Sequence, residues 1–254
     1  MSFSINTNTV GARALNSLNR STTDMSSSIE KFSTGKKINS AADDASGMMI
    51  ADTLGSQARG AGQMIMNAND SISIAQIKDG ALGEATSIIQ GIREKVVQAS
   101  SSALSSSDRG VIQQDIAKSM ESLGKIYEGS QFNGQKLFSD SSPGLSSLSK
   151  IDLSTVESSQ SSIEMVDDAI EQTSKMRSDI GANQSQLEST INSLSIGMIN
   201  SYQSESTIKD VDIAQESMNM KQIENLRTAG IFALAQANSQ PKNVISLLGG
   251  QIAA

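Results

Sequence analysis

Apolar residues recur every three or four positions along most of this chain, and this spacing constrains the fold more than any other feature. Only two prolines, Pro143 and Pro241, occur in 254 residues, so nothing before Pro143 forbids long uninterrupted helices. The alternation of three and four is the heptad pattern of helices that pack side by side. The sequence therefore predicts a mainly α fold, built as a long antiparallel helical bundle or coiled coil.

A first helix is predicted to end at Gly35. Glycine readily adopts the left-handed conformation of a helix end, and the two lysines that follow it favour the negative end of the helix dipole. Ser40 and Asp43 then resemble a capping box, so we expect the next helix to begin there. The apolar stripe of the first helix consists of Leu15, Leu18, Met25, Ile29 and Phe32.

Two further long helices are predicted on either side of a turn-rich centre. The second helix is expected from about residue 43 to residue 100, and Ser107 or Asp108 is expected to cap a third helix after a serine-rich loop. Asn133-Gly134 is the preferred pair for a tight turn, which predicts a small β-hairpin near 130–155.

The remaining chain returns as helix. The serine-rich stretch 139–162 is expected to be a loop, and Ser161 with Glu164 resembles a second capping box where a long helix resumes. Pro241 is expected to interrupt the last helix. The apolar residues of this final segment are Ile223, Leu226, Leu234, Val244, Leu247 and Leu248.

Composition excludes several classes of protein. The net charge of -7 and the pI of 4.7 disfavour a nucleic-acid binder, which needs a basic face. With no Cys and no His, the chain lacks thiolate nucleophiles, imidazole bases and the usual transition-metal ligands. No apolar run approaches the length of a membrane span, and the first residues do not resemble a secretory signal peptide. We therefore expect a protein that is not an enzyme and has no cofactor, no metal and no membrane partner.

The free energy needed to order the two chain ends exceeds what their own apolar residues can return. Ordering a residue costs about 1.5 kcal/mol, whereas a fully buried aliphatic side chain returns about 1.5–3 kcal/mol. The first forty or so residues offer only about five such side chains in their stripe. The ends are therefore expected to need additional surfaces, and we predict that sibling copies of the chain provide them.

Several sequence blocks resemble bacterial flagellins. The most specific is Ser33–Gly47, STGKKINSAADDASG, which is similar to the family's S-G-x-R-I-N-x-A-x-D-D-A-A-G block. Gln131–Gly134 (QFNG), Arg177–Ala182 (RSDIGA) and Leu234–Asn238 (LAQAN) resemble further blocks in the same order. The likeness covers both ends and most of the chain, and it is that of a short form without the outer variable domains.

The resemblance implies a function and a domain organisation. It implies a structural subunit that polymerises into the extracellular flagellar filament for swimming motility. Residues 1–42 and 209–254 would form the inner coiled coil, and residues 43–208 an α-helical rod with its hairpin. It also implies partners: the type III export apparatus, which exports the chain unfolded, an export chaperone at the C-terminal segment, and hook-associated and cap proteins.

One block departs from the family. Flagellins sensed by the flagellin-specific innate immune receptor resemble Q-R-x-R-E-L in the second long helix, whereas residues 90–95 read QGIREK. Gly91 replaces the first arginine of the motif and Lys95 its leucine, while Arg93 is kept. The carboxylate expected on the next helix is shortened to Asp115. These departures predict weak activation of the receptor.

Two alternatives fit parts of the pattern. The hook–filament junction protein has similar ends, although the dense block at 234–248 favours flagellin. A cytoplasmic coiled-coil signalling protein could show the same periodicity. It would be absent from sheared extracellular filaments.

Overall fold

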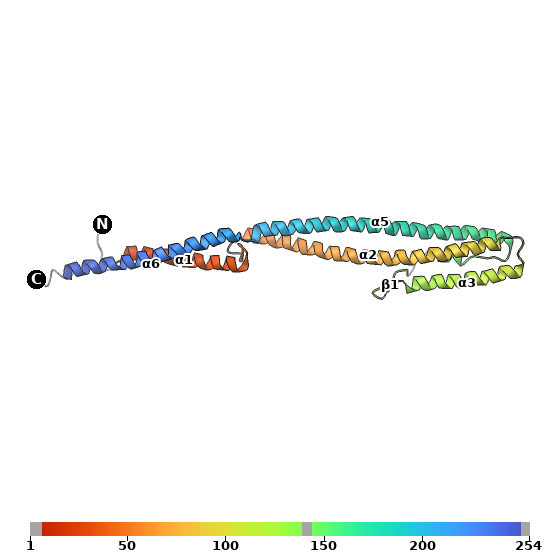
Figure 1. The fold of residues 1–254 in the computed structure, drawn as a ribbon, viewed down its shortest axis with the longest axis horizontal. Helices are drawn as coiled ribbons and strands as arrows, with labels where there is room; N and C mark the ends of the chain where they lie inside the picture. The colour runs from red at the N-terminus through yellow and green to blue at the C-terminus, as the bar shows by residue number, and fades with distance from the viewer. Residues whose placement is uncertain (1–6, 139–143, 250–254) are drawn as a thin grey trace. The chain divides into compact units, whose positions relative to one another are not determined.

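The computed structural model describes residues 7–138 and 144–249, with side chains up to residue 240. It forms two compact units, one of Met1–Ala58 with Ile199–Ala254 and one of Arg59–Met198. The elements in chain order are α1 Thr9–Thr34, α2 Ala45–Ala99, α3 Ser106–Gly129, β1 Gln131–Phe132, β2 Gln135–Lys136, α4 Leu145–Leu148, α5 Val156–Lys209 and α6 Ile213–Gly249. The predicted mainly α fold with antiparallel helices and a small hairpin is confirmed (Figure 1).

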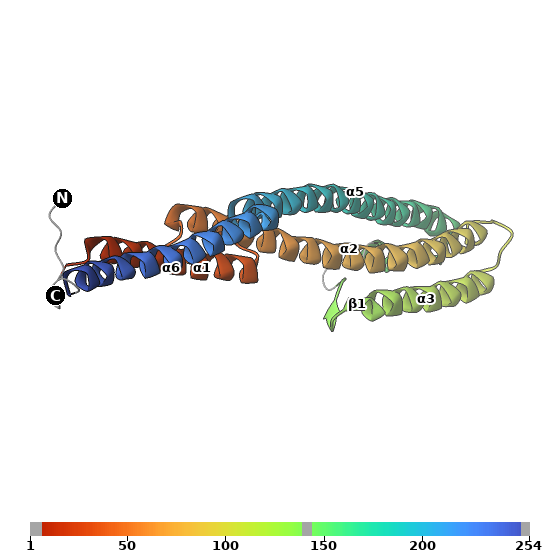
Figure 2. The same ribbon diagram turned by 60° about the vertical axis from the view of Figure 1, so that its left-hand side comes forward.

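In the first unit, α1 and α6 lie side by side in both views (Figures 1 and 2). They run antiparallel, because Asn8 near the start of α1 donates a hydrogen bond to the carbonyl of Ala237 at 3.0 Å, while Ser28 near its end donates to Glu216. The two helices approach closely at Gly230, where an added Cβ would lie 3.9 Å from the Cβ of Leu18. Small residues in the seam permit this approach.

A short backbone junction joins the end of α1 to the start of α6. Gly35 ends α1 in the left-handed conformation, with φ 69°, as predicted. Its carbonyl accepts a hydrogen bond from the amide of Val211 at 3.0 Å, and the amide of Lys37 donates to the carbonyl of Lys209 at 2.8 Å. These bonds hold the ends of the two helices level with each other.

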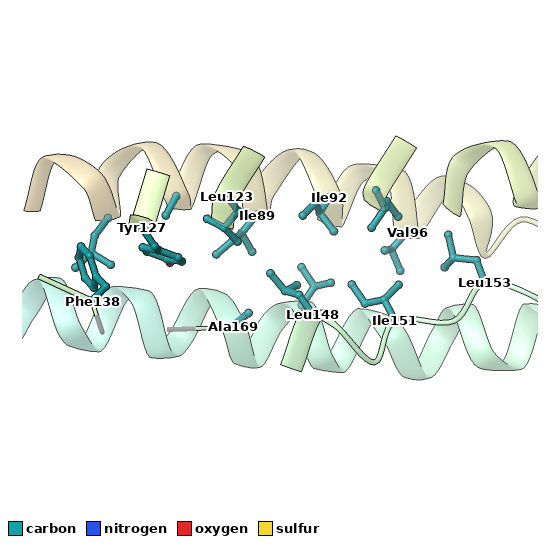
Figure 3. Packing of buried hydrophobic residues seen from close by; sticks show 14 of the residues in the cluster. Ile89, Ile92, Val96, Leu123, Tyr127, Phe138, Leu148, Ile151, Leu153 and Ala169 are labelled. Atoms are coloured by element: carbon teal, nitrogen blue, oxygen red, sulfur yellow. The ribbon is translucent and has the colours of Figure 1, made fainter. Parts of the chain in front are cut away.

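In the second unit, α2, α3 and α5 enclose an aliphatic core (Figure 3). The side chains of Tyr127 and Phe138 stack in a tilted pair with ring centroids 5.0 Å apart. Burial raises the pKa of Tyr127 to about 12, because the phenolate form would lose its hydration. The fully buried aliphatic residues of this core include Leu82, Ile89, Ile92, Val96, Ile116, Leu123, Leu148 and Val166.

The hairpin forms where it was predicted. Asn133 and Gly134 both have positive φ, at 49° and 78°, which is the requirement of the type I′ turn that suits the twist of a two-residue hairpin. The antiparallel register pairs Gln131 with Lys136 and Phe132 with Gln135.

The starts of two helices differ from prediction. Ser40 and Asp43 do not cap α2. The Asp43 carboxylate accepts from the amide of Ser40 at 2.9 Å in the preceding turn, and Asp44 caps the helix by accepting from the amide of Gly47 at 2.9 Å. Helix α3 starts two to three residues earlier than expected, because Ser105 and Asp108 form a reciprocal capping box.

Two further expectations about the C-terminal half are wrong. Helix α5 begins at Val156, because Thr155 and Ser158 exchange cap hydrogen bonds of 3.0 Å, so Ser161 lies inside the helix and the loop is shorter than 139–162. Its part at 139–143 lies outside the described residues. Helix α6 runs through Pro241 to Gly249, since one missing donor in a helix of 37 residues need not end it.

Candidate assembly surface

The predicted apolar stripe of α1 divides between two environments. Leu18 and Met25 are half-buried on the side that faces α6. Leu15, Ile29 and Phe32 are exposed, because α6 covers only part of the apolar arc of α1. The stripe therefore supplies both a contact within the chain and apolar surface outside it.

The predicted residues of α6 divide in the same way. Ile223 and Leu234 are half-buried, whereas Leu226 is 55% exposed. Val244, Leu247 and Leu248 lie on the helical backbone, but their side chains lie outside the described part of the chain.

Periodicity missed much of this surface. Ile213, Met218, Ile231 and Phe232 of α6 are all large, apolar and exposed, with Phe232 at 71%. They do not keep the register of the predicted stripe, so a search for a single seam passes over them. The sequence indicates this surface only by the number of large apolar residues on α6, which is more than one helix–helix contact can bury.

The α1–α6 seam is polar near the end of α1. Ser28 is buried and its hydroxyl donates to the carboxylate of Glu216, which is also buried. Beside this pair lies a hollow of about 310 Å³. Its lining residues are Asp24, Ser27, Ser28, Lys31, Glu216, Asn219, Gln222, Ile223 and Leu226.

The residues of the altered receptor motif lie in the second unit, and two of them are held by ion pairs. Arg93 of α2 donates to Asp167 of α5 at 2.6 Å, and Lys95 pairs with Asp115 of α3 at 2.9 Å. These hydrogen bonds lower the pKa of both aspartates below the ordinary value, because they favour the ionised form. Gly91 has open space where a side chain would start.

The Arg93–Asp167 pair predicts a dependence of stability on pH. Because the folded pKa of Asp167 is lowered, its contribution is present above the unfolded pKa and is lost as the pH falls through the folded pKa. We expect Asp167→Asn to lower the urea midpoint slightly at neutral pH, and the difference from the unmodified chain to vanish in acid. Asp168→Asn is the control, since it removes the same charge at a carboxylate without an ion pair in the described structure. An equal effect of both variants would contradict the prediction.

No helix in the described part of the chain has an apolar stretch long enough to cross a membrane. Within the same residues, no three acidic side chains gather in a way that could hold a metal ion.

Comparison with known proteins decides the family. Residues 5–142, more than half of the chain, match the model of the bacterial flagellin N-terminal helical region, and residues 163–248 match the C-terminal helical region. The chain belongs to the bacterial flagellin family. Flagellins are structural proteins, and both helical regions of the family are present.

Whole relatives agree with this assignment. A flagellin of Halalkalibacterium halodurans is 36% identical over 245 residues, which cover 87% of this chain and 90% of the relative. The flagellin of Bacillus subtilis is 32% identical over 92% of this chain and 97% of its own length. The flagellar filament 31.3 kDa core protein of Treponema maltophilum is 30% identical over 87% of this chain and 91% of its own length.

Proposed function

We propose that this flagellin is a structural subunit that polymerises into the extracellular filament of the bacterial flagellum and thereby serves swimming motility. The observation that carries the proposal is the apolar surface of α1 and α6. Ile29, Leu226 and Phe232 are each more than half exposed on helices that have already packed against each other. Such surface is unfavourable in water and indicates contacts with other molecules. In a homopolymer, further copies of the chain provide them.

The chain ends and the middle segment have different roles in this proposal. Residues 1–42 and 209–254 form the inner coiled coil of the filament, through the seam residues predicted for each arm. Residues 43–208 form the surrounding rod. The pairing of α1 with α6 supports the first assignment, and the aliphatic core shared by α2, α3 and α5 supports the second.

The proposal includes the route to the filament. An export chaperone covers the C-terminal segment, and the chain then passes unfolded through the type III export apparatus. Hook-associated proteins lie at the base of the growing polymer and cap proteins at its tip. The exposed apolar residues of α6 support the role of the chaperone, because they would otherwise face water before assembly. The chain has no enzymatic activity in this role. The hook–filament junction protein and the signalling coiled coil are less well supported, because the relatives described above are flagellins and filament core proteins.

Two measurements test the function. Purified chain is expected to polymerise on seeding or in a precipitating salt, giving filaments visible by electron microscopy. In the source bacterium, deletion of the gene should remove or alter the filament, and plasmid-borne protein should restore it together with swimming. Protein that stays monomeric under every polymerising condition, and never appears in sheared filaments, would refute the proposal.

The altered receptor motif gives a separate prediction. Monomer of this flagellin is expected to activate the innate immune receptor weakly in reporter cells. Gly91→Arg combined with Lys95→Leu restores the two lost side chains, and a Cβ at residue 91 would meet no atom within 4 Å. We expect this variant to raise the response by at least tenfold, roughly the 1.4 kcal/mol of one good contact. A reporter response unchanged by the two substitutions would show that other residues limit recognition.

A further inference from the structure

We propose that neighbouring copies in the filament join through two unlike flanks of the α1–α6 pair, with a projecting apolar flank of one copy seated in the hollow on the opposite flank of the next. This inference rests on the proposed function, since it names the surfaces through which the polymer forms. It follows from where the exposed side chains lie around each helix.

On α1, the residues that face α6 define the seam. They follow a three-and-four spacing: Gly11, Ala14, Leu18, Ser21, Met25 and Ser28. Successive residues are turned by about 100° around the helix axis. Seen along that axis, Leu15 and Ile29 lie on one side of the seam residues. Asp24 and Lys31 fall on the other side.

On α6, the seam follows the same rule. It contains Glu216, Met220, Ile223, Gly230, Leu234 and Ala237. Ile213 and Ile231 lie on one side of these seam residues, while Gln222 and Leu226 lie on the other.

The hollow shows which sides of the two helices coincide. It is lined by Asp24 and Lys31 from α1 together with Gln222 and Leu226 from α6, so these four residues share one flank. The apolar residues of the other sides must then share the opposite flank. They are about half exposed: Leu15 48%, Ile29 52%, Ile213 48% and Ile231 52%.

The two flanks complement each other in shape and polarity. None of the five charged residues of α1 lies on the projecting flank. The charges that assembly would desolvate there come from α6 alone, at Glu224 and Arg227. The hollow has Ile223 and Leu226 among its lining residues, so an inserted aliphatic side chain would find apolar atoms there.

Their charges are complementary as well. The hollow is lined by the carboxylates of Asp24 and Glu216 and the single ammonium of Lys31, which leaves one negative charge in excess. On α6, Glu224 and Arg227 lie on the same side as Ile231, and the Glu224 carboxylate pairs with Lys221 at 2.8 Å. These three residues leave one positive charge in excess. A cation on one flank therefore meets an anionic hollow on the other.

Symmetry favours contact between unlike flanks. A contact between two identical flanks closes on itself and yields a dimer. A contact between unlike flanks leaves a free flank at each end of the pair, so copies continue to add. A filament subunit needs the second kind.

The absence of cysteine from the chain makes a direct test possible. Ile29→Cys marks the projecting flank and Leu226→Cys marks the hollow, and each site is exposed enough to tolerate the change. Filaments of the two single variants and of the double variant are verified by electron microscopy, treated with a flexible bis-maleimide, and analysed on denaturing gels. We expect a ladder of cross-linked oligomers from the double variant alone.

Other results would overturn the inference. Cross-linked dimers from Ile29→Cys alone would show that like flanks meet, and intact filaments without any cross-link would show that neither flank is a contact. A failure of the unmodified chain to form filaments would instead count against the proposed function.

A mixing experiment gives an independent measurement. Ile231→Asp and Leu226→Asp each disable one flank, so each variant alone should stay monomeric. In an equimolar mixture, the intact hollow of the first variant can bind the intact projecting flank of the second. We expect dimers that do not elongate, detected by analytical ultracentrifugation. A mixture that remains monomeric, or one variant that polymerises alone, contradicts the pairing of unlike flanks.

Discussion

A chain carrying Leu15→Asp and Ile29→Asp is expected to remain folded and to lose the ability to polymerise. Both side chains are about half exposed on α1, so the folded monomer tolerates a carboxylate at either position. In the polymer, each substitution forfeits apolar burial of about 1 kcal/mol or more and adds the cost of desolvating a charge. Each factor of ten in the critical concentration corresponds to roughly 1.4 kcal/mol of lost assembly free energy. Together these losses are therefore expected to raise the critical concentration at least 100-fold. Sedimentation of polymer over a concentration series measures this change.

The control for this prediction adds the same two charges elsewhere on α1. Asn16→Asp and Thr23→Asp lie on the face turned away from α6, where both residues are already polar and exposed. No apolar burial is lost there, so the critical concentration should change by less than about tenfold. Far-ultraviolet circular dichroism of both double variants should match the unmodified chain. If the two variants polymerise alike, net charge rather than the apolar residues of α1 controls assembly.

Local chemistry made most of the fold predictable from the sequence. Gly35 ends α1 and Asn133-Gly134 makes the hairpin turn, because in each case a few neighbouring residues determine the backbone conformation. The long helices were predictable for a related reason, since a spacing of three and four sustained over many turns places apolar side chains on one face only if the backbone is helical. Exact helix starts were less predictable. Several Ser, Thr and Asp residues near each start can accept the same amide protons, and tertiary packing selects among them.

The division of the apolar residues could not be predicted, because it depends on which face the partner helix covers. Leu15 and Leu18 belong to one stripe in the sequence, yet only Leu18 packs toward α6. The seam uses Gly230, which carries no hydrophobic signal but allows a close approach to Leu18 of α1. The hollow beside Glu216 is likewise a property of the helix pair and of neither helix alone.

The serine-rich connection hides a second feature that the sequence did not reveal. Serines dominate the stretch after the hairpin, and this composition predicted a loop. In the structure, Leu148, Ile151 and Leu153 from this stretch enter the core of the second unit, and Leu148 and Leu153 are almost completely buried (Figure 3). Their irregular spacing matches neither helix nor strand, so no periodicity marks them as core residues.

Leu148→Ala is therefore expected to destabilise the second unit strongly, by about 2–5 kcal/mol. Leu148 is 0% exposed and belongs to the cluster that contains Ile92, Leu123 and Ala169. Removing its branched end leaves a cavity that a short helix of four residues cannot fill without losing its own contacts. The free energy of unfolding in urea measures the effect.

The chain provides a reporter that isolates this unit. It contains two tyrosines and no tryptophan, and Tyr127 lies in the affected core whereas Tyr202 belongs to the first unit. In a Tyr202→Phe background, tyrosine fluorescence follows the second unit alone. Val111→Ala is the control, because Val111 is 65% exposed and its truncation should change the free energy of unfolding by no more than about 0.5 kcal/mol. Equal urea midpoints for Leu148→Ala and Val111→Ala would mean that Leu148 covers the core without stabilising it. The serine-rich connection would then contribute little to the stability of the second unit.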